Sequence, residues 1–403
     1  MEQGREPIEE DIPDTKRWSE SPRIRHIGTE ELHELMWELN TKDVVPGQTW
    51  WWWWWIFFIK NPKNPSKPRQ LMVLWSTKDC DTIKVDDFDW FRRRPITRGE
   101  EAEEGSTKTL DFNGMVAVWY YDGETMKDPF RLKECDFKVE RKERSGALLP
   151  SLEKDYNFTG EEHNWVVNIK GGPVDFHFEM GPWNTFLTSP RHSKRAYIKQ
   201  YGYEILKIFG TTLKGTIESE GEKEEIDGSA YFQKVTVNAP TIPWFWCVLH
   251  TERGDYLDYF IPHVGPSMFR KKLDHKSVLD RQGHSLSRHL QFYNAPIDRL
   301  FRFRDLKISK SYDENDLPTF ILNGKAEDSS IRVVLKSYSR ATWRFQQKYL
   351  KLLTSILYYN EYPVTIAEFE LKWQDEKGEE KRLLKEDLGQ TMGNCEHAWG
   401  KLI

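Results

Sequence analysis

The strongest constraint in this sequence is an unbroken apolar run from Trp50 to Ile59, which opens with six consecutive tryptophans and is ended by Lys60. The run is about half of the ~20 residues that a helix needs to cross a bilayer. Consecutive tryptophans also disfavour a helix, because each ring loses χ1 freedom against the preceding turn. We therefore expect a β-strand that is covered on both faces.

Rings on both faces of one strand allow two interpretations. They can fill the core of a barrel, which is the usual place of aromatic side chains. They can also line a pocket for an extended hydrophobic or polyene ligand, or stabilise a carbocation through their ring faces. Both can hold at once, and we expect one face to line the ligand, with Trp51, Trp53 and Trp55 as candidate ligand-binding residues. Trp119, from a separate apolar segment, is a further candidate.

Hairpin signals recur along the rest of the chain. Apolar runs at 50–60 and 69–77 flank a loop of turn-forming residues, and another run leads into Asp122-Gly123. Further pairs of β-type runs flank Gly221, Gly254 and Gly378. Many short strands with few helices predict an all-β fold, and the strand-rich region divides near residue 215 into two consecutive antiparallel β-barrels.

Two segments look helical. In residues 1–45 charge dominates, and Thr29 is placed to cap a short helix, which predicts an N-terminal helical arm that packs on a barrel. In residues 341–359 apolar side chains recur at roughly helical spacing, which predicts one further helix. The expected organisation is therefore an arm at 1–45, a first barrel at 46–215 and a second barrel at 216–403.

Charge and cysteine usage exclude several classes of function. The 59 basic and 64 acidic residues give a formal net charge of -5 without a long basic tract, which does not favour a nucleic-acid partner. Cysteines at 80, 135, 247 and 395 form no CxxC pair and predict buried, reduced thiols. The charged N-terminus predicts no secretory signal, and hence a cytoplasmic location.

Without a P-loop, Rossmann pattern, GxSxG elbow or HExxH, we expect neither cofactor nor metal.

Several short motifs resemble one known family. The tryptophan run followed by the apolar segment at 69–75 is similar to its opening hairpin. Gly228-Ser229-Ala230-Tyr231, Pro243-Trp244-Phe245-Trp246 and Gly254-Asp255-Tyr256-Leu257 resemble its central strands, and 394–400 resembles its closing strand. The family is the tandem lipocalin-like group of carotenoid 1,2-hydratase (hydroxyneurosporene synthase), AttH-like proteins and some Diels–Alder cyclases, and tocopherol cyclases share a similar layout. The resemblance spans about residues 46–403 and implies two lipocalin-like barrels.

The chain departs from that family's pattern at Gln233. Hydratase-like members carry an acidic residue at this place, and an amide cannot donate a proton to an alkene as an acid does. The resemblance makes Gln233 and its neighbour Tyr231 candidate catalytic residues. Asp258, Glu361 and Glu396 lie among aromatic residues and are the acids that would take over, with Asp258 and Glu396 as catalytic candidates. The alternative for each is a surface carboxylate at the end of a strand.

Three further candidates share one face of a single strand. Trp244, Trp246 and His250 lie at even spacing, so they are expected to point to the same side and to bind ligand together. His250 is either a buried histidine with satisfied hydrogen bonds or a polar contact for a ligand or proton relay.

These features predict a protein that binds a hydrophobic, isoprenoid-like small molecule in an aromatic-lined cavity. It would act on the molecule by proton transfer, through hydration, isomerisation or cyclisation, and the alternative is a non-catalytic carrier of the same ligand. An inward-facing acid whose pKa is raised by burial would distinguish the two. The expected partners are this ligand and a peripheral membrane contact from which to collect it.

Overall fold

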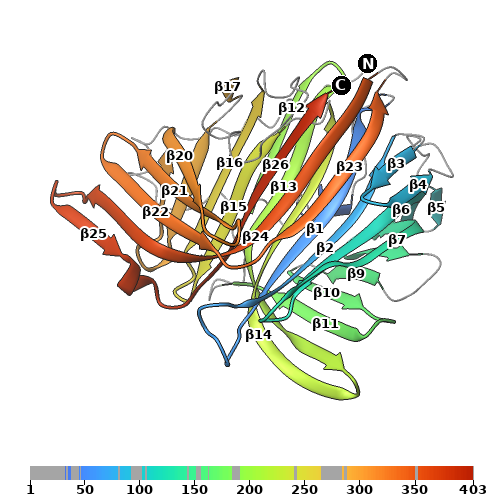
Figure 1. Cartoon of the computed structure of the whole chain (residues 1–403), viewed down its shortest axis with the longest axis horizontal. Coiled ribbons are helices and arrows are strands. Elements are labelled where there is room, and N and C mark those ends of the chain that lie inside the picture. The colour runs from blue at the N-terminus through green and yellow to red at the C-terminus, as the bar shows by residue number, and fades with distance from the viewer. Residues whose placement is uncertain are drawn as a thin grey trace.

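The computed structural model describes residues 32, 35–37, 45, 47–79, 82–91, 102–104, 107–142, 145–150, 156–161, 163–183, 191–239, 243–264, 284–285, 288–349 and 353–402. Almost all of them lie in antiparallel strands, so the prediction of an all-β fold is confirmed. The strands form two sheets. Figure 1 shows the first mainly in blue to green and the second mainly in yellow to red.

The first sheet contains a closed barrel of ten strands. Around the barrel the order is β11-β10-β9-β8-β7-β6-β2-β1-β14-β13, and β13 closes it by pairing with β11. Two more strands, β5 and β12, extend the sheet at β6 and β13. The strands are β1 (Thr49–Ile59), β2 (Arg69–Lys78), β5 (Ala102–Glu104), β6 (Thr107–Tyr121), β7 (Met126–Arg141), β8 (Ser145–Pro150), β9 (Tyr156–Glu161), β10 (Asn164–Ile169), β11 (Val174–Gly181), β12 (Arg191–Ile198), β13 (Tyr201–Ser219) and β14 (Glu222–Asn238).

The second sheet is larger and open. Its main order is β19-β18-β16-β15-β26-β24-β22-β21-β20, and the ladder of described strands does not join β19 to β20. The strands are β3 (Thr82–Val85), β4 (Phe88–Phe91), β15 (Trp244–Thr251), β16 (Tyr256–Val264), β17 (His284–Ser285), β18 (His289–Asn294), β19 (Arg299–Phe303), β20 (Asp305–Tyr312), β21 (Pro318–Lys325), β22 (Ser329–Ser337), β23 (Ala341–Tyr349), β24 (Leu353–Gln374), β25 (Glu380–Leu384) and β26 (Thr391–Leu402). Two short 3₁₀ helices, η2 (Ala295–Ile297) and η3 (Lys385–Leu388), interrupt them. The structure thus has one closed barrel and a second large antiparallel sheet. The sequence predicts a second closed barrel, but the described strands of the second sheet do not close into one.

The tryptophan run is the buried strand that the sequence predicts. β1 pairs along its whole length with β2 and β14, and its burial continues on both faces. From Trp51 to Ile59, the odd-numbered residues of β1 belong to the core inside the first barrel, which we call the first-barrel core. From Trp52 to Phe58, the even-numbered residues lie in a second cluster, built from side chains of both sheets, which we call the inter-sheet layer.

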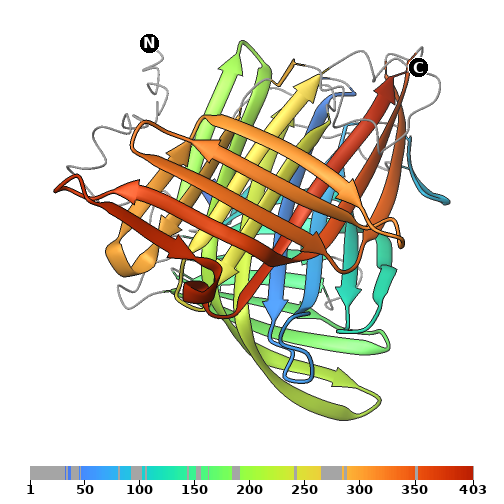
Figure 2. The same cartoon turned by 60° about the vertical axis from the view of Figure 1, so that its left-hand side comes forward.

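The inter-sheet layer lies where the two sheets pack face to face. Figure 1 shows β15, β24 and β26 of the second sheet beside β1, β2 and β13 of the first. In Figure 2 the orange strands of the second sheet cross the direction of its own yellow strands and of the green strands of the first sheet. Along β15 the even-numbered residues face this layer, while the odd-numbered ones fill a third cluster, the second-sheet core. The fold therefore has three apolar regions, and the middle one is built by both sheets.

The helix predicted for residues 341–359 is wrong. These residues form β23 and the beginning of β24, paired from Ala341↔Glu361 to Tyr349↔Leu353. Ala341, Trp343 and Phe345 are buried, and the residues between them are partly exposed. This alternation has the period of a strand, and aromatic side chains fit a half-buried pleated surface well. The looser helical spacing of the leucines and Ile356 was misleading.

The predicted helical arm lies mostly outside the described residues. Of residues 1–45, the structure describes Leu32, 35–37 and Val45, and all five are buried. Leu32 and 35–37 have helical backbone and pack in the first-barrel core. The domain limits at 45 and 215 stay predictions. β13 runs through residue 215, and β14 after it belongs to the first sheet.

The cysteines agree with the prediction as far as they are described. Cys135, Cys247 and Cys395 are buried free thiols, and Cys80 lies outside the described residues. Among the described residues, no helix is long and apolar enough to cross a membrane.

Candidate functional site

The inter-sheet layer brings together most of the residues that the sequence singled out. Trp119, Tyr231 and Trp246 are members of it, and Trp244 packs against its edge. By contrast, Trp51, Trp53 and Trp55 lie in the first-barrel core. The predicted ligand-binding tryptophans are therefore divided between two regions, and the layer between the sheets is the candidate site.

Two buried carboxyl groups are neighbours on adjacent strands of the second sheet. Glu361 on β24 is directly opposite Glu396 on β26, and their exposed fractions are 0% and 2%. Burial raises the pKa of Glu361 to about 8. Burial, and then the charge of Glu361, raise the pKa of Glu396 well above its ordinary value. This acid pair therefore holds protons at neutral pH.

Polar groups surround the acid pair but leave part of it unpaired. Asn394 donates its amide to Glu361 Oε2, and Gln70 of the first sheet donates to Asn394 Oδ1 at 2.9 Å. Tyr359 lies beside both carboxyls and Trp244 beside Glu396, and each partly offsets the rise in the pKa of its neighbouring carboxyl. The other oxygens, Oε1 of Glu361 and Oε1 of Glu396, are buried and have no hydrogen-bond partner. Two polar atoms are thus available to a ligand within an apolar environment.

Aromatic rings lead away from the acid pair. The Tyr359 ring lies 6.1 Å from the ring centroids of each of Trp119, Trp244 and Phe345. Trp119 lies 4.1 Å from Trp343. A positive charge formed beside the acids would meet ring faces that attract cations.

Asp258 is a fixed charge and not a proton donor. Burial alone would raise its pKa, but Lys207 and His289 outweigh burial and lower the pKa to about 2. Lys207 Nζ lies 2.9 Å from Oδ1 and 3.1 Å from Oδ2, and Trp246 Nε1 donates to Oδ1 at 3.2 Å. Lys207 comes from the first sheet and Asp258 from the second, so this buried ion pair links the sheets.

Gln233 and Tyr231 are on one face of β14 and form a pair. The Tyr231 hydroxyl donates to Gln233 Oε1 at 3.1 Å, and the Tyr231 ring lies 5.1 Å from Trp246. Burial raises the pKa of Tyr231 well above its ordinary value. The pair is therefore neutral, and its contact with Trp246 places it in the inter-sheet layer.

His250 is a buried histidine with both nitrogens satisfied. Its Nε2 lies 2.6 Å from the Phe209 carbonyl oxygen, which only accepts, so Nε2 carries the proton. Its Nδ1 then accepts from the Ser229 hydroxyl at 2.7 Å. Burial lowers the pKa of His250 to about 3, so the ring is neutral at neutral pH.

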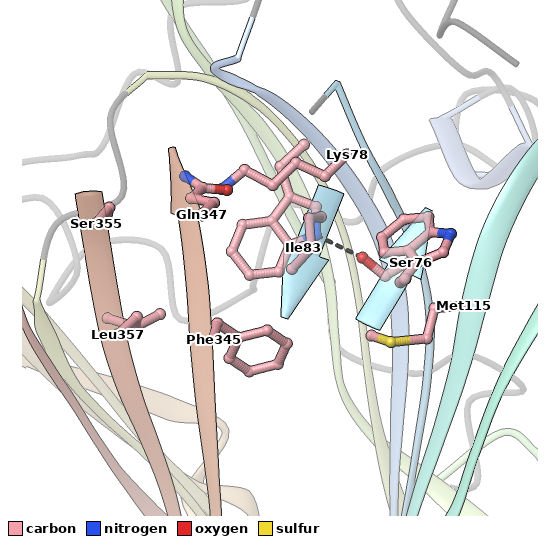
Figure 3. Close-up of a pocket in the computed structure, with 10 residues that line it drawn as sticks. Ser76, Lys78, Ile83, Met115, Phe345, Gln347, Ser355 and Leu357 are labelled. Atoms are coloured by element: carbon pink, nitrogen blue, oxygen red, sulfur yellow. Dashed lines mark hydrogen bonds between the residues drawn. The ribbon is translucent and has the colours of Figure 1, made fainter. Parts of the chain in front are cut away.

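A small pocket opens at one end of the inter-sheet layer. It lies between β23 and β24 of the second sheet and β2 and β6 of the first, as Figure 3 shows. The enclosed volume is about 20 Å³, which is room for roughly one water. Its lining residues are Trp50, Ser76, Lys78, Ile83, Trp90, Met115, Phe345, Gln347, Ser355 and Leu357.

The pocket and the acid pair lie along one face of β24. Ser355 and Leu357 line the pocket, and Tyr359 and Glu361 follow at the same two-residue spacing. Phe345 lines the pocket and also contacts Tyr359. The layer therefore joins a pocket at its rim to two neutral acids in its interior.

The sequence did not single out several residues of this site. Tyr359 and Gln347 fall in the segment predicted as a helix, so their strand spacing was hidden. Lys207 and Gln70 belong to the first sheet, and only the packing of the sheets brings them to Asp258 and Asn394. Among the described residues, no cluster of His, Cys, Asp and Glu is arranged to hold a metal ion.

Comparisons with known proteins give likenesses of structure. No family model matches the sequence, and no curated protein matches it. A putative AttH from Nitrosomonas europaea is similar over 87% of this chain and 92% of its own, with 10% identity and a TM-score of 0.48. Kievitone hydratase from Nectria haematococca is similar over 94% of each chain, with 12% identity and a TM-score of 0.36. CghA is similar over 89% of this chain and 94% of its own, with 7% identity and a TM-score of 0.38.

The first of these structures carries the name of one group that the sequence motifs resemble. Likenesses at these identities carry no substrate or reaction over to this chain. Its function has to be argued from its own side chains.

Proposed function

We propose that this protein binds a hydrophobic, isoprenoid-like small molecule in the inter-sheet layer and acts on it by proton transfer. The observation that carries the proposal is the acid pair, Glu361 and Glu396, buried between aromatic rings with one unpartnered oxygen on each. A carboxylic acid that is neutral at pH 7 is a proton donor held ready in a dry environment.

The chemistry follows from the protonated state of the pair. The O–H of one glutamic acid gives its proton to an alkene carbon, and the alkene's electron pair forms the new C–H bond. The cation that results lies near the faces of Tyr359, Trp119 and Trp244, which stabilise positive charge. The glutamate then takes a proton back, from an added water in hydration or from a neighbouring carbon in isomerisation or cyclisation.

Binding requires the inter-sheet layer to open. The pocket encloses about 20 Å³, whereas pockets for drug-sized ligands measure roughly 300–1,000 Å³. Trp50 and Phe345 pack 5.9 Å apart at the pocket, from different sheets, so their separation would lengthen the pocket toward Tyr359. The ligand would thus replace contacts between aromatic side chains with contacts to itself.

A non-catalytic carrier is the second candidate. The amide at Gln233, where hydratase-like members have an acid, favours it. A carrier needs the aromatic layer but has no use for a protonated carboxyl pair. The two candidate functions therefore differ in whether the acid pair donates a proton to the ligand.

One experiment tests both candidates. Farnesol, a long-chain isoprenoid alcohol, is titrated while intrinsic tryptophan fluorescence is recorded, and organic extracts of longer incubations are analysed by mass spectrometry. We expect saturable quenching in the wild type and in the Glu396→Gln and Glu361→Gln variants, with product only in the wild type. Glu368→Gln is the matched control, because Glu368 lies on the same strand but its side chain is 61% exposed.

The outcomes separate the hypotheses. Quenching without product in any sample would reject catalysis of this ligand and support the non-catalytic carrier. A flat titration for farnesol, retinol and a fatty alcohol alike would remove the ligand-binding proposal, and the rings would then be core only. Equal product from wild type and both glutamine variants would show that the acids are not the donors.

A cytoplasmic location and a peripheral membrane contact are part of the same proposal. A ligand with little solubility in water is collected most directly from a bilayer surface. Cell fractionation and co-sedimentation with lipid vesicles test these two points.

A further inference from the structure

The turn between β12 and β13 exposes apolar side chains. Ile198 ends β12 and Tyr201 begins β13, and their exposed fractions are 83% and 46%. Lys199 and Gln200 between them are exposed as well. The described part of the chain leaves three large apolar side chains exposed, and two of them lie in this one turn. Apolar side chains that gather at one place, and are not scattered singly, indicate a contact surface.

Positive charge is concentrated beside this turn. Residues 182–204 have three more basic than acidic side chains, whereas the whole chain has a net charge of -5. The basic residues are Arg191, Lys194, Arg195 and Lys199, and the acid is Glu204. β12 is an edge strand in the described ladder, and basic residues on an edge strand commonly prevent pairing with another sheet. The exposed Ile198 and Tyr201 do not serve that purpose, which favours a binding surface.

The opposite end of the same strand is acidic. β13 runs from the turn at 198–201 to a second turn with β14, where residues 218–225 contain five glutamates and one lysine. Figure 1 shows β12 at the top of the molecule and the hairpin of β13 and β14 at the bottom. A negatively charged surface would therefore attract the first end and repel the second, which gives the molecule one orientation on such a surface.

The basic, apolar turn lies at the pocket end of the inter-sheet layer. The Gln200 carbonyl oxygen accepts from Asn238 Nδ2 at 2.9 Å, and the Thr49 hydroxyl donates to Asn238 Oδ1 at 2.8 Å. β14 separates β13 from β1, so at a strand spacing of about 4.8 Å the turn is roughly 10 Å from the start of β1. Trp50, the next residue of β1, lines the pocket. A surface that contacts the turn is therefore close to the rim of the pocket.

We propose that the β12–β13 turn docks this protein on an anionic lipid bilayer. Ile198 and Tyr201 enter the headgroup region, and the positive charge of residues 191–199 lies against the lipid phosphates. Two apolar side chains and three excess charges each give weak binding alone, so a stable contact needs both. The inference rests on the proposed function for its purpose, because docking here brings the pocket to the phase in which a hydrophobic ligand dissolves.

The test is co-sedimentation of the full chain with vesicles of phosphatidylcholine alone and of phosphatidylcholine with phosphatidylserine. We expect the wild type to bind the anionic vesicles on the order of tenfold or more tightly than the neutral ones, and to lose this preference in high salt. Ile198→Ser/Tyr201→Ser should weaken binding to the anionic vesicles on the order of tenfold, because it removes the apolar insertion. Lys199→Glu should weaken it by roughly tenfold, because it replaces an attracted charge with a repelled one.

Matched controls come from other parts of the surface. Ile297 has the same exposed fraction as Tyr201, but it lies on η2, between β18 and β19 of the second sheet. Lys223 is exposed in the acidic turn at the opposite end of β13. Ile297→Ser and Lys223→Glu should therefore bind both kinds of vesicle as the wild type does.

The results distinguish this inference from the proposed function. Equal binding of the wild type to both kinds of vesicle, or equal losses in the turn variants and their controls, would overturn the docking surface. Binding to an acidic polymer such as heparin without binding to anionic vesicles would also overturn it, since the charge would then serve another partner. Quenching by farnesol is measured without vesicles, and the turn variants should retain it, because none of their residues lines the pocket. If the wild type binds anionic vesicles but farnesol gives no quenching, the proposed function fails and the docking surface stands.

Discussion

The buried acid pair makes a quantitative prediction about stability and pH. In the folded protein burial raises the pKa of Glu361 to about 8, whereas its unfolded value is near 4.5. Its stabilising contribution is therefore complete below the unfolded pKa and is lost as the pH rises through the folded one. Each carboxyl that is neutral when folded and ionised when unfolded lowers the free energy of unfolding by roughly 1.4 kcal/mol per pH unit. Glu361 and Glu396 together should lower it by up to roughly 2.7 kcal/mol per unit.

A window between pH 6.5 and 7.5 is where the acid pair contributes most against the other shifted groups. Burial lowers the folded pKa of His250 to about 3 and that of His263 to about 4, from an unfolded value of 6.5. Their contribution opposes that of the acid pair, is largest at the low end of the window and fades toward pH 7.5. Burial raises the pKa of Asp128 to about 6, and Asp258 titrates near 2, so most of their change lies below the window. Within the window the acid pair should dominate the slope.

The assay is equilibrium unfolding in urea at pH 6.5, 7.0 and 7.5, followed by tryptophan fluorescence. The wild type should lose stability with rising pH, Glu361→Gln should lose it less steeply, and Glu361→Gln/Glu396→Gln should not lose it. Glutamine keeps the acceptor for Asn394 at position 361. The exposed control Glu368→Gln should follow the wild type. A flat wild-type profile, or equal slopes in wild type and Glu361→Gln, would refute the neutral acid pair.

Three further variants test the rest of the site. Lys207→Met should destabilise the protein by up to about 3–5 kcal/mol in urea unfolding, because the buried Asp258 carboxylate loses its ion pair and keeps His289 and Trp246 beside it, and adding Asp258→Leu should recover most of the loss. Ser229→Ala should cost about 1–3 kcal/mol in thermal unfolding, because His250 Nδ1 loses its donor; no change would mean that water replaces it. Gln233→Ala should cost on the order of 1 kcal/mol of stability. If Gln233 orients substrate, turnover should fall much more than binding, and unchanged turnover would limit it to packing.

The fold class was readable because its signals are local. The tryptophan run, the Asp122-Gly123 turn and the alternation of Trp244 and Trp246 each depend on neighbouring residues, and all lie in strands or turns as predicted. Whether a sheet closes depends on pairings between distant strands, such as β11 with β13, and no local pattern encodes that. The error at 341–359 arose because two periodicities overlap there, and the alternation of Trp343 and Phe345 was the correct one.

The site was readable in its parts but not in its arrangement. The period-two rule places Trp54 and Trp55 on opposite faces of β1, but it does not say which face turns into the barrel. The tryptophans at 51, 53 and 55 fill the first-barrel core, and those at 52 and 54 pack in the inter-sheet layer. Similarly, Asp258 and Glu396 are both acids among aromatic residues. Lys207, brought from the other sheet, and His289 make Asp258 a fixed anion, while Glu396 stays neutral.

The position of the acids explains how the amide at Gln233 is compatible with proton-transfer chemistry. Gln233 and Tyr231 enter the inter-sheet layer from the first sheet, and Glu361 and Glu396 enter it from the second. Trp246 contacts Tyr231 and is directly opposite Glu396 in the ladder, so it connects the two groups. A carboxyl at Gln233 would bring a further acid near the negative charge of Asp258, which already raises the pKa of Tyr231. The acids of the second sheet owe their raised pKa values first to burial, and the amide is left to hydrogen-bond Tyr231. The reaction we propose therefore depends on both sheets being packed together.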